Sequence, residues 1–193
     1  MSAKEVLRKK LVDARCALDA NYKKTASENV ARHIQDSSLF SKSQNIACYL
    51  AHEGELDCYP LIKKIWEEKK NCYLPRLSEN HDKKLSFVAY RENEELIPNK
   101  YKILEPQSNT TIAPEMLDLV IVPVVGFDLT GNRLGMGAGY YDATFSFLNS
   151  DENAKKCFLL GVGYAMQEVE SLPQDLWDVK LNAIATEKTI IIL

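Results

Sequence analysis

The chain has 193 residues, of which 46% are hydrophobic, enough to build one core in a single domain spanning residues 1–193. Its 24 basic and 27 acidic residues give a formal charge of −3, so nothing in the overall charge favours nucleic acid or an acidic membrane as a partner. No apolar run approaches the ~20 residues of a membrane span, and the charged N-terminal stretch is unlike a signal peptide. We expect a cytoplasmic protein that acts as a monomer.

The hydrophobic pattern predicts alternating helices and strands along the chain. In chain order, we expect helices over 3–19 and 24–38, a strand over 45–50, a helix over 61–70, strands over 71–77, 85–90 and 119–125, a helix over 142–148, and strands over 157–163 and 189–193. This alternation, with nearly continuous apolar strands, predicts a single layered α/β domain. Its central sheet should be mostly parallel or mixed and flanked by helices, in a Rossmann-like arrangement.

The first predicted helix carries three cationic residues on one side. At 100° per residue, Lys4, Arg8 and Arg15 fall within about 40° of one another, beside a stripe of leucines. Long cationic side chains at such an edge usually extend along the apolar surface into solvent. From the residues alone, that structural role is favoured over an anion site.

The strand over 119–125 is followed by the chain's most informative loop. A turn over 128–132 leads to Arg133 and to glycines at alternate positions, Gly135, Gly137 and Gly139, before the predicted helix over 142–148. Glycine-rich backbone leaves N–H groups uncovered, and a helix start can add to an anion site. The loop is neither a Walker A motif nor a dinucleotide fingerprint. By spacing alone, a phosphate cradle and a simple connecting loop remain equally good interpretations.

Acidic residues form two further candidate groups. Glu53, Glu55 and Asp57 alternate and would share one face of an extended segment, although such acids are usually solvated. Asp142 fits a helix N-cap, and Asp178 a surface position after a tryptophan. The histidines lack metal-ligand spacing, and no nucleophile–base pair supports a covalent acyl-enzyme mechanism.

The segment LDLVIVPVVGFDLTGNRLGMGAGYYD, residues 117–142, resembles the signature of the 5-formyltetrahydrofolate cyclo-ligase (5,10-methenyltetrahydrofolate synthetase) family, PGxxFDxxGxRLGxGxGYYD. The matching residues are Pro123, Phe127, Asp128, Gly131, Arg133, Leu134, Gly135, Gly137, Gly139, Tyr140, Tyr141 and Asp142. Residues 4–8, 53–57, 74–76 and 101–106 are similar to further family landmarks, so the resemblance covers most of the chain.

The resemblance implies a ligase that uses ATP and Mg²⁺ to convert 5-formyltetrahydrofolate to 5,10-methenyltetrahydrofolate, with Arg133 and Tyr141 as catalytic residues. It assigns nucleotide binding to Lys4, Arg8, Arg15, Arg133, Leu134, Gly135, Met136, Gly137, Ala138, Gly139, Tyr140 and Tyr141. It assigns folate binding to Leu50, Glu55, Tyr101 and Tyr140, and magnesium to Asp142 and Asp178.

Three departures from the common family pattern bear on the phosphate and metal sites. Met136 and Ala138 stand where many relatives carry basic residues, and Asn182 stands where an aspartate is frequent. Positive charge for a triphosphate must then come from Arg133, the first helix and magnesium. Two other interpretations stay open: a sugar-phosphate isomerase-like enzyme on a similar fold, and a non-catalytic folate- or nucleotide-binding module.

Overall fold

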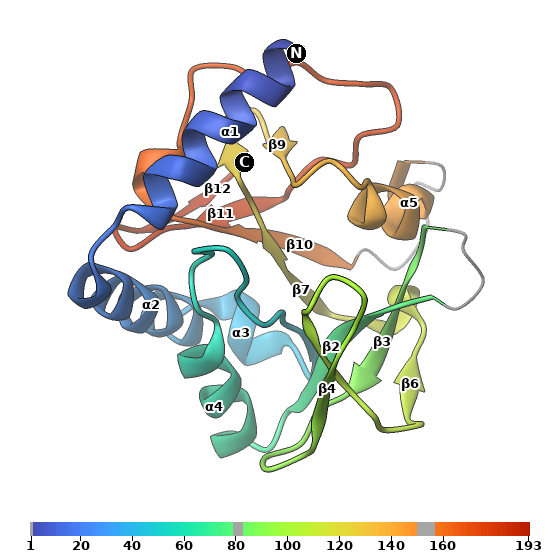
Figure 1. Ribbon diagram of the computed structural model, residues 1–193. Coiled ribbons are helices and arrows are strands. Elements are labelled where there is room, and N and C mark those ends of the chain that lie inside the picture. The colour runs from blue at the N-terminus through green and yellow to red at the C-terminus, as the bar shows by residue number, and fades with distance from the viewer. Residues whose placement is uncertain (1, 79–82, 150–156) are drawn as a thin grey trace.

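The computed structural model describes residues 2–78, 83–149 and 157–193, and its centre is an eight-stranded mixed sheet (Figure 1). The strand order is β12-β11-β10-β7-β1-β2-β3-β6. The strands are β1 (Asn45–Ala47), β2 (Asn71–Leu77), β3 (Leu85–Ala89), β6 (Thr111–Ile112), β7 (Leu119–Pro123), β10 (Phe158–Val162), β11 (Ala183–Ala185) and β12 (Ile190–Ile192). The central strands β2, β1, β7, β10 and β11 are parallel, and the outer strands β12, β3 and β6 pair antiparallel. The predicted α/β class is confirmed.

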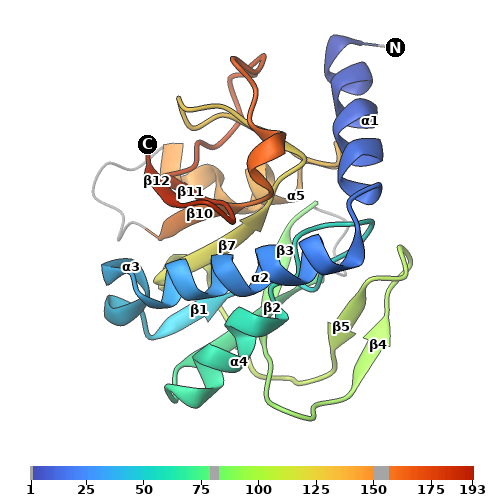
Figure 2. The same ribbon diagram turned by 90° about the vertical axis from the view of Figure 1, so that its left-hand side faces the viewer.

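Helices cover both faces of the sheet. Successive strand residues point to opposite sides, and in the central strands both sets are apolar, so each face needs a covering layer. Leu119 and Ile121 of β7 pack in the core beneath α2 (Ala20–Gln35) and α4 (Tyr59–Glu67), which Figure 2 shows on one face of the sheet. Val120 and Val122 pack on the other face, together with Phe145 of α5 (Tyr140–Phe145). The short α3 (Ser38–Lys42) follows α2.

Smaller elements surround this sheet. Helix α1 (Ala3–Cys16) packs Leu11 against Val125, Leu134 and Leu172 in a separate small core. The described elements also include two hairpins, β4 (Leu96–Pro98) with β5 (Leu104–Pro106) and β8 (Gly126–Phe127) with β9 (Arg133–Leu134). There are three 3₁₀ helices among the described residues: η1 (Pro114–Met116), η2 (Ser146–Asn149) and η3 (Ala165–Gln167). Within the described ranges, none of the helices combines the length and apolar character needed to cross a bilayer.

Several predicted boundaries are wrong for local reasons. The first helix ends at Cys16 rather than residue 19, because Asp19 caps α2 by accepting a hydrogen bond from the Tyr22 N–H at 2.9 Å. Helix α2 therefore starts at Ala20, not residue 24. Helix α5 starts at Tyr140 rather than residue 142, since Gly139 caps it in the left-handed conformation at φ +73°.

The topology places a crevice at the carboxyl end of the sheet. From β1 the chain moves outward to β2, and it later returns to β7 on the opposite side of β1. The connections leaving β1 and β7 therefore diverge, and ligands of open α/β sheets bind where this reversal occurs. The segments after β1 and after β7 are the expected lips of a binding site.

Candidate active site

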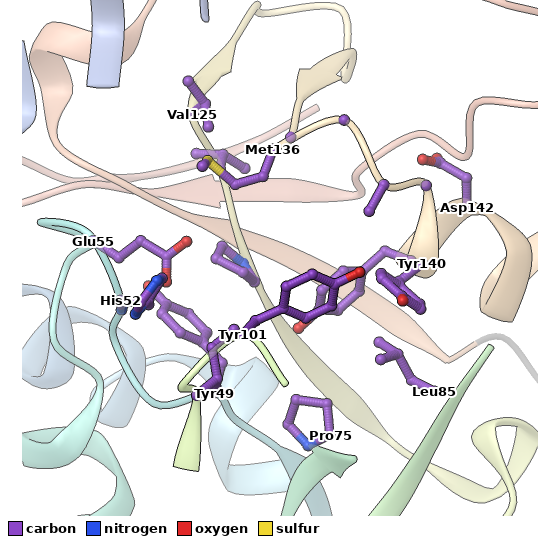
Figure 3. Close-up of a pocket in the computed structure, with 18 of the residues that line it drawn as sticks. Tyr49, His52, Glu55, Pro75, Leu85, Tyr101, Val125, Met136, Tyr140 and Asp142 are labelled. Atoms are coloured by element: carbon purple, nitrogen blue, oxygen red, sulfur yellow. The ribbon is translucent and has the colours of Figure 1, made fainter. Parts of the chain in front are cut away.

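A cavity of about 370 Å³ opens at this crevice (Figure 3). Its walls come from the segments after β1 and β7, the glycine loop 135–139, the N-terminal half of α1, the β4–β5 hairpin and the loop 175–178. Figure 3 shows Glu55 and Asp142 on opposite sides of this space, with Tyr101 and Tyr140 between them in that view. The cavity thus has two ends, and we call them the Glu55 end and the Asp142 end.

Almost every residue assigned to ligand binding from the sequence lies on this one cavity. The lining includes Lys4, Arg8, Leu50, Glu55, Tyr101, Arg133, Leu134, Gly135, Met136, Gly137, Ala138, Gly139, Tyr140, Tyr141, Asp142 and Asp178. Arg15 is the exception, because it does not line the cavity. The structure therefore brings together segments as far apart as α1, the β4–β5 hairpin and the loop 175–178.

The glycine loop wraps around Arg8. The Arg8 Nε donates a hydrogen bond of 2.7 Å to the Gly135 carbonyl oxygen. Gly137 has φ +99°, and a β-carbon there would come within 3.4 Å of the Arg8 guanidinium carbon. Glycine at 137 thus permits both the left-handed backbone and the close approach of the cation.

At the Asp142 end, the predicted phosphate ligand and the predicted metal ligand pair with each other. The Arg133 guanidinium donates hydrogen bonds to Asp142 Oδ1 and to the Val179 carbonyl oxygen. The same Asp142 oxygen accepts the Val179 N–H at 3.0 Å. The Arg133 side chain is only 6% exposed, so contacts within the protein fix its position without a ligand.

A second ion pair lies beside the first. Lys4 Nζ is 2.7 Å from Asp175 Oδ2 and 3.5 Å from Asp178 Oδ2. The hydrogen bond with Asp175 is the main reason that the pKa of Lys4 is raised. Asp178 also accepts the Asp175 N–H at 2.9 Å. Lysine at this point offers a movable point charge for an anion.

The acidic side chains described at this end are too few to bind a metal ion without further ligands. Within the described part of the chain, no three His, Cys, Asp or Glu side chains gather as a metal site. Asp142 and Asp178 supply the hard carboxylate oxygens that magnesium prefers, and magnesium usually completes its shell with water and phosphate oxygens. The donor set therefore fits an ion brought in with a triphosphate rather than one held by protein alone.

At the Glu55 end, the cavity presents one shielded carboxylate. The Glu55 side chain is 12% exposed, and its Oε2 accepts the His52 N–H at 3.1 Å. Burial raises the pKa of Glu55, while the nearby Arg15 charge and the His52 hydrogen bond lower it. Tyr49, which follows β1, donates its hydroxyl to the Leu56 carbonyl oxygen at 2.8 Å and so fixes the base of this wall.

Arg15 lies behind this wall. It is 1% exposed, and its guanidinium faces Glu55 Oε1 at 3.7 Å and the Val124 carbonyl oxygen at 3.2 Å. The guanidinium that the resemblance assigns to phosphate binding is therefore already paired with these two protein groups. A direct contact between Arg15 and phosphate stays a prediction that this geometry does not support.

Three of the tyrosines that line the cavity are Tyr101, Tyr140 and Tyr141. Burial raises the pKa of Tyr141 far above its usual value, so its phenol stays protonated and able to donate. Tyr101, on the β4–β5 hairpin, and Tyr140, at the start of α5, interact electrostatically, which lowers the pKa of Tyr101 and raises that of Tyr140. This interaction links the hairpin to the N-terminus of α5 across the cavity.

Sequence reasoning missed other lining residues, among them Tyr49, Asn99, Asp175 and Trp177. Tyr49 directly precedes the predicted Leu50, so the carboxyl end of the strand was a usable signal. Asp175 lies three residues before Asp178, a spacing too common to be informative. Asn99 belongs to a hairpin whose strands of three residues have no detectable periodicity.

Comparison with known proteins identifies the family. The model of the 5-formyltetrahydrofolate cyclo-ligase family matches residues 1–187. The chain belongs to this family. It is 34% identical over 180 residues to 5-formyltetrahydrofolate cyclo-ligase of Haemophilus influenzae, covering 92% of this chain and 94% of that protein. The Escherichia coli K12 enzyme of the same name is also 34% identical, with 91% and 96% covered.

A solved structure agrees. The NMR structure of Aquifex aeolicus 5,10-methenyltetrahydrofolate synthetase superposes with a TM-score of 0.83 at 32% identity, covering 99% of this chain and 93% of that one. The family predicted from the glycine-loop signature is thus confirmed.

Proposed function

We propose that this family member catalyses the ATP-dependent conversion of 5-formyltetrahydrofolate to 5,10-methenyltetrahydrofolate. The observation that carries the proposal is the single cavity that joins two kinds of site. One end offers Lys4, Arg8, Arg133 and the backbone of the glycine loop, which suit a triphosphate. The other offers the shielded carboxylate of Glu55, which suits the N–H donors of a pterin ring.

The reaction requires activation of a poor electrophile. A formamide oxygen attacks the γ-phosphorus of ATP, the bond to the β–γ bridging oxygen breaks, and ADP leaves. The folate N10 then attacks the formyl carbon and loses its proton, and the C–O bond breaks to release phosphate as the five-membered ring closes. Such a reaction needs alignment of two substrates and neutralisation of moving negative charge more than it needs a protein nucleophile.

Arg133 is the residue best placed to neutralise that charge. Its rigid fork is held at the cavity by the Val179 carbonyl oxygen, and its second contact, Asp142, also lines the cavity. An incoming phosphoryl oxygen can therefore replace the Asp142 carboxylate as the acceptor of the Arg133 hydrogen bond, or accept a second hydrogen bond beside it. In either case the guanidinium moves little. Lys4 and Arg8 supply further charge from α1, and the protonated Tyr141 supplies a neutral donor.

Asp142 and Asp178 would hold magnesium that enters with ATP, and the ion would neutralise charge on the phosphates. Each of these two residues keeps one carboxylate oxygen that accepts no hydrogen bond from the described residues. Those oxygens are the atoms we assign to the ion or to its bound water.

The sugar-phosphate isomerase alternative fits less well, and the non-catalytic module differs from the proposal only in turnover. A sugar-phosphate isomerase needs a phosphate cradle but no second site at the Glu55 end, and the cyclo-ligase family model matches residues 1–187. A non-catalytic module would bind folate or nucleotide and leave both unchanged.

One assay separates the three. The purified protein is incubated with 5-formyltetrahydrofolate, with and without ATP and Mg²⁺, while the absorbance of the methenyl product is followed. We expect product only when ATP is present, with ADP and phosphate formed in equal amount. Binding of both ligands without product would support the non-catalytic module, and turnover of a sugar phosphate would support the isomerase.

A further inference from the structure

Arg15 is a fully buried cation that the proposed reaction does not use directly. We propose that Arg15 is a positioning residue, which holds the Glu55 carboxylate in place for the folate and joins the two lips of the crevice. The inference rests on the proposed function, because it concerns how the folate end of that cavity is built.

The burial of Arg15 requires that its charge be matched. A guanidinium removed from water is costly unless it is paired and hydrogen-bonded. Its only carboxylate within 4 Å, among the residues described, is that of Glu55, at 3.7 Å. Glu55 lines the cavity whereas Arg15 does not. The ligand therefore meets the carboxylate, and the arginine acts on it from behind.

The remaining contacts of Arg15 are with backbone and with the glycine loop. Its Nε donates to the Glu53 carbonyl oxygen at 3.1 Å, and its Nη1 donates to the Val124 carbonyl oxygen at 3.2 Å. Its Nη2 lies 3.8 Å from the sulfur of Met136. One side chain thus connects the loop after β1, the end of β7 and the glycine loop. These are the segments that diverge at the sheet's reversal point.

The loop that carries Glu55 has a backbone that needs such support. Glu53 has φ +46° and Gly54 has φ +75°, both in the left-handed region, which is unfavourable for a glutamate. The Glu53 carbonyl oxygen accepts hydrogen bonds from Arg15 and, at 3.2 Å, from the Cys16 thiol. The last turn of α1 therefore holds this turn in the conformation that points Glu55 into the cavity.

The position of Arg15 on α1 separates its role from that of Arg8. The two arginines lie on the same side of the helix, but Arg15 is seven residues, about 10 Å, further along the axis. Arg8 contacts the glycine loop and lines the cavity, whereas Arg15 lies beneath the loop 53–55. The same helix thus serves both ends of the site.

The charge of Arg15 also affects the protonation of Glu55. The titratable groups that face Glu55 are Arg15, Tyr49, His52, Glu53, Cys58 and Tyr141. Among them Arg15 is the strongest influence that keeps the carboxyl ionised, against burial, which raises its pKa. Without Arg15, Glu55 would take up a proton at higher pH and would lose its capacity to accept two donors from the folate.

The test compares Arg15→Met, Arg15→Lys, Glu55→Gln and the double variant Arg15→Met/Glu55→Gln. For each, thermal unfolding, the KM for 5-formyltetrahydrofolate, the KM for ATP and the pH profile are measured. We expect Arg15→Met to raise the folate KM about 10-fold or more and to leave the ATP KM within about 2-fold. The acid limb of kcat/KM for folate should move to higher pH. In the Glu55→Gln background, most of the effect of Arg15→Met should disappear, as expected for residues that act as a pair.

Three results would overturn the proposal. A raised ATP KM with an unchanged folate KM would make Arg15 a phosphate contact. An effect of equal size in the Glu55→Gln background would show that Arg15 does not act through Glu55. If Arg15→Met fails to fold, Arg15→Lys decides: it keeps the charge and loses the fork, so the folate KM should rise several-fold with an unshifted pH profile. A wild-type folate KM in that variant would contradict the inference. Absence of product from the unaltered protein would instead refute the proposed function itself.

Discussion

Two arginine–carboxylate pairs stand at opposite ends of the cavity, and they differ in which partner faces the ligand. At one end, Arg133 and Asp142 both line the cavity. At the other, only Glu55 does, because Arg15 is buried behind it. A pair whose members both face the cavity can open to admit a ligand. A pair with one member buried can only present the other.

This difference assigns different chemistry to the same residue types. The Arg133 guanidinium can exchange a carboxylate oxygen for a phosphoryl oxygen, so its contribution can grow as charge develops in the transition state. The Arg15 guanidinium keeps its partner throughout, so its contribution falls on ground-state binding of the folate. Kinetic constants should therefore separate the two pairs: kcat at the Asp142 end and folate KM at the Glu55 end.

The largest expected effect comes from Arg133→Ala. A charge-assisted hydrogen bond is worth about 1.5–3 kcal/mol, so loss of one contact made in the transition state should lower kcat roughly 10- to 100-fold. Initial rates at saturating folate and ATP measure it. Arg32→Ala, which removes an exposed arginine of α2, is the matched control and should keep the wild-type rate. A folded Arg133→Ala protein with wild-type turnover would remove Arg133 from the mechanism.

Glu55→Gln tests the other pair. It keeps the shape of the side chain but removes the charge, so the folate KM should rise about 10- to 30-fold while the ATP KM stays nearly unchanged. Since burial raises the pKa of Glu55, folate binding should weaken as pH falls through that pKa, and the variant should lack this acid limb. Glu67→Gln, on the exposed end of α4, is the control. A rise in ATP KM alone would reverse the two ends of the cavity.

The sequence was sufficient to predict the parts of this comparison that are local in the chain. The glycine loop, Arg133 and Asp142 lie within ten residues, and their spacing alone puts them together. The central parallel strands were also predictable, because their runs of apolar residues are long enough to identify. Even there, the helix boundaries near Asp19 and Gly139 were missed, since each depends on a single cap.

Arg15 shows why the rest could not be predicted. Helical periodicity places it on the same side as Lys4 and Arg8, and the family resemblance assigns all three to the nucleotide. Periodicity fixes the angle around the helix but not which tertiary neighbour lies at each height along it. The neighbour at the height of Arg15 is the turn at Glu53, which is 38 residues away in sequence. Such a contact exists only once the crevice has formed.

Asp142→Asn tests whether the cavity-facing carboxylate also serves magnesium. Asparagine can still accept the Val179 N–H and the Arg133 hydrogen bond, so the fold should survive. We expect the magnesium concentration for half-maximal rate to rise about 10-fold, because one anionic oxygen is lost. Asp178→Asn should produce a smaller, few-fold rise. Magnesium titrations of initial rate measure both, and curves that coincide with wild type at the same maximal rate would exclude both residues from the ion.

The smallest expected effect comes from adding charge at the open end. Ala138 is an exposed residue of the glycine loop that lines the cavity, and Ala138→Lys would place a cation near the proposed triphosphate. An ion pair in contact with solvent is worth at most about 1 kcal/mol, so the ATP KM should fall only about 2- to 5-fold, and less at high salt. Ala138→Gln, which adds similar length without charge, should leave it unchanged. If Ala138→Lys instead lowers the folate KM, or has no effect on ATP at low salt, the loop does not carry the phosphates. A modest gain here beside a large loss at Glu55 would show that solvent access, more than charge itself, sets what each end of the cavity can contribute.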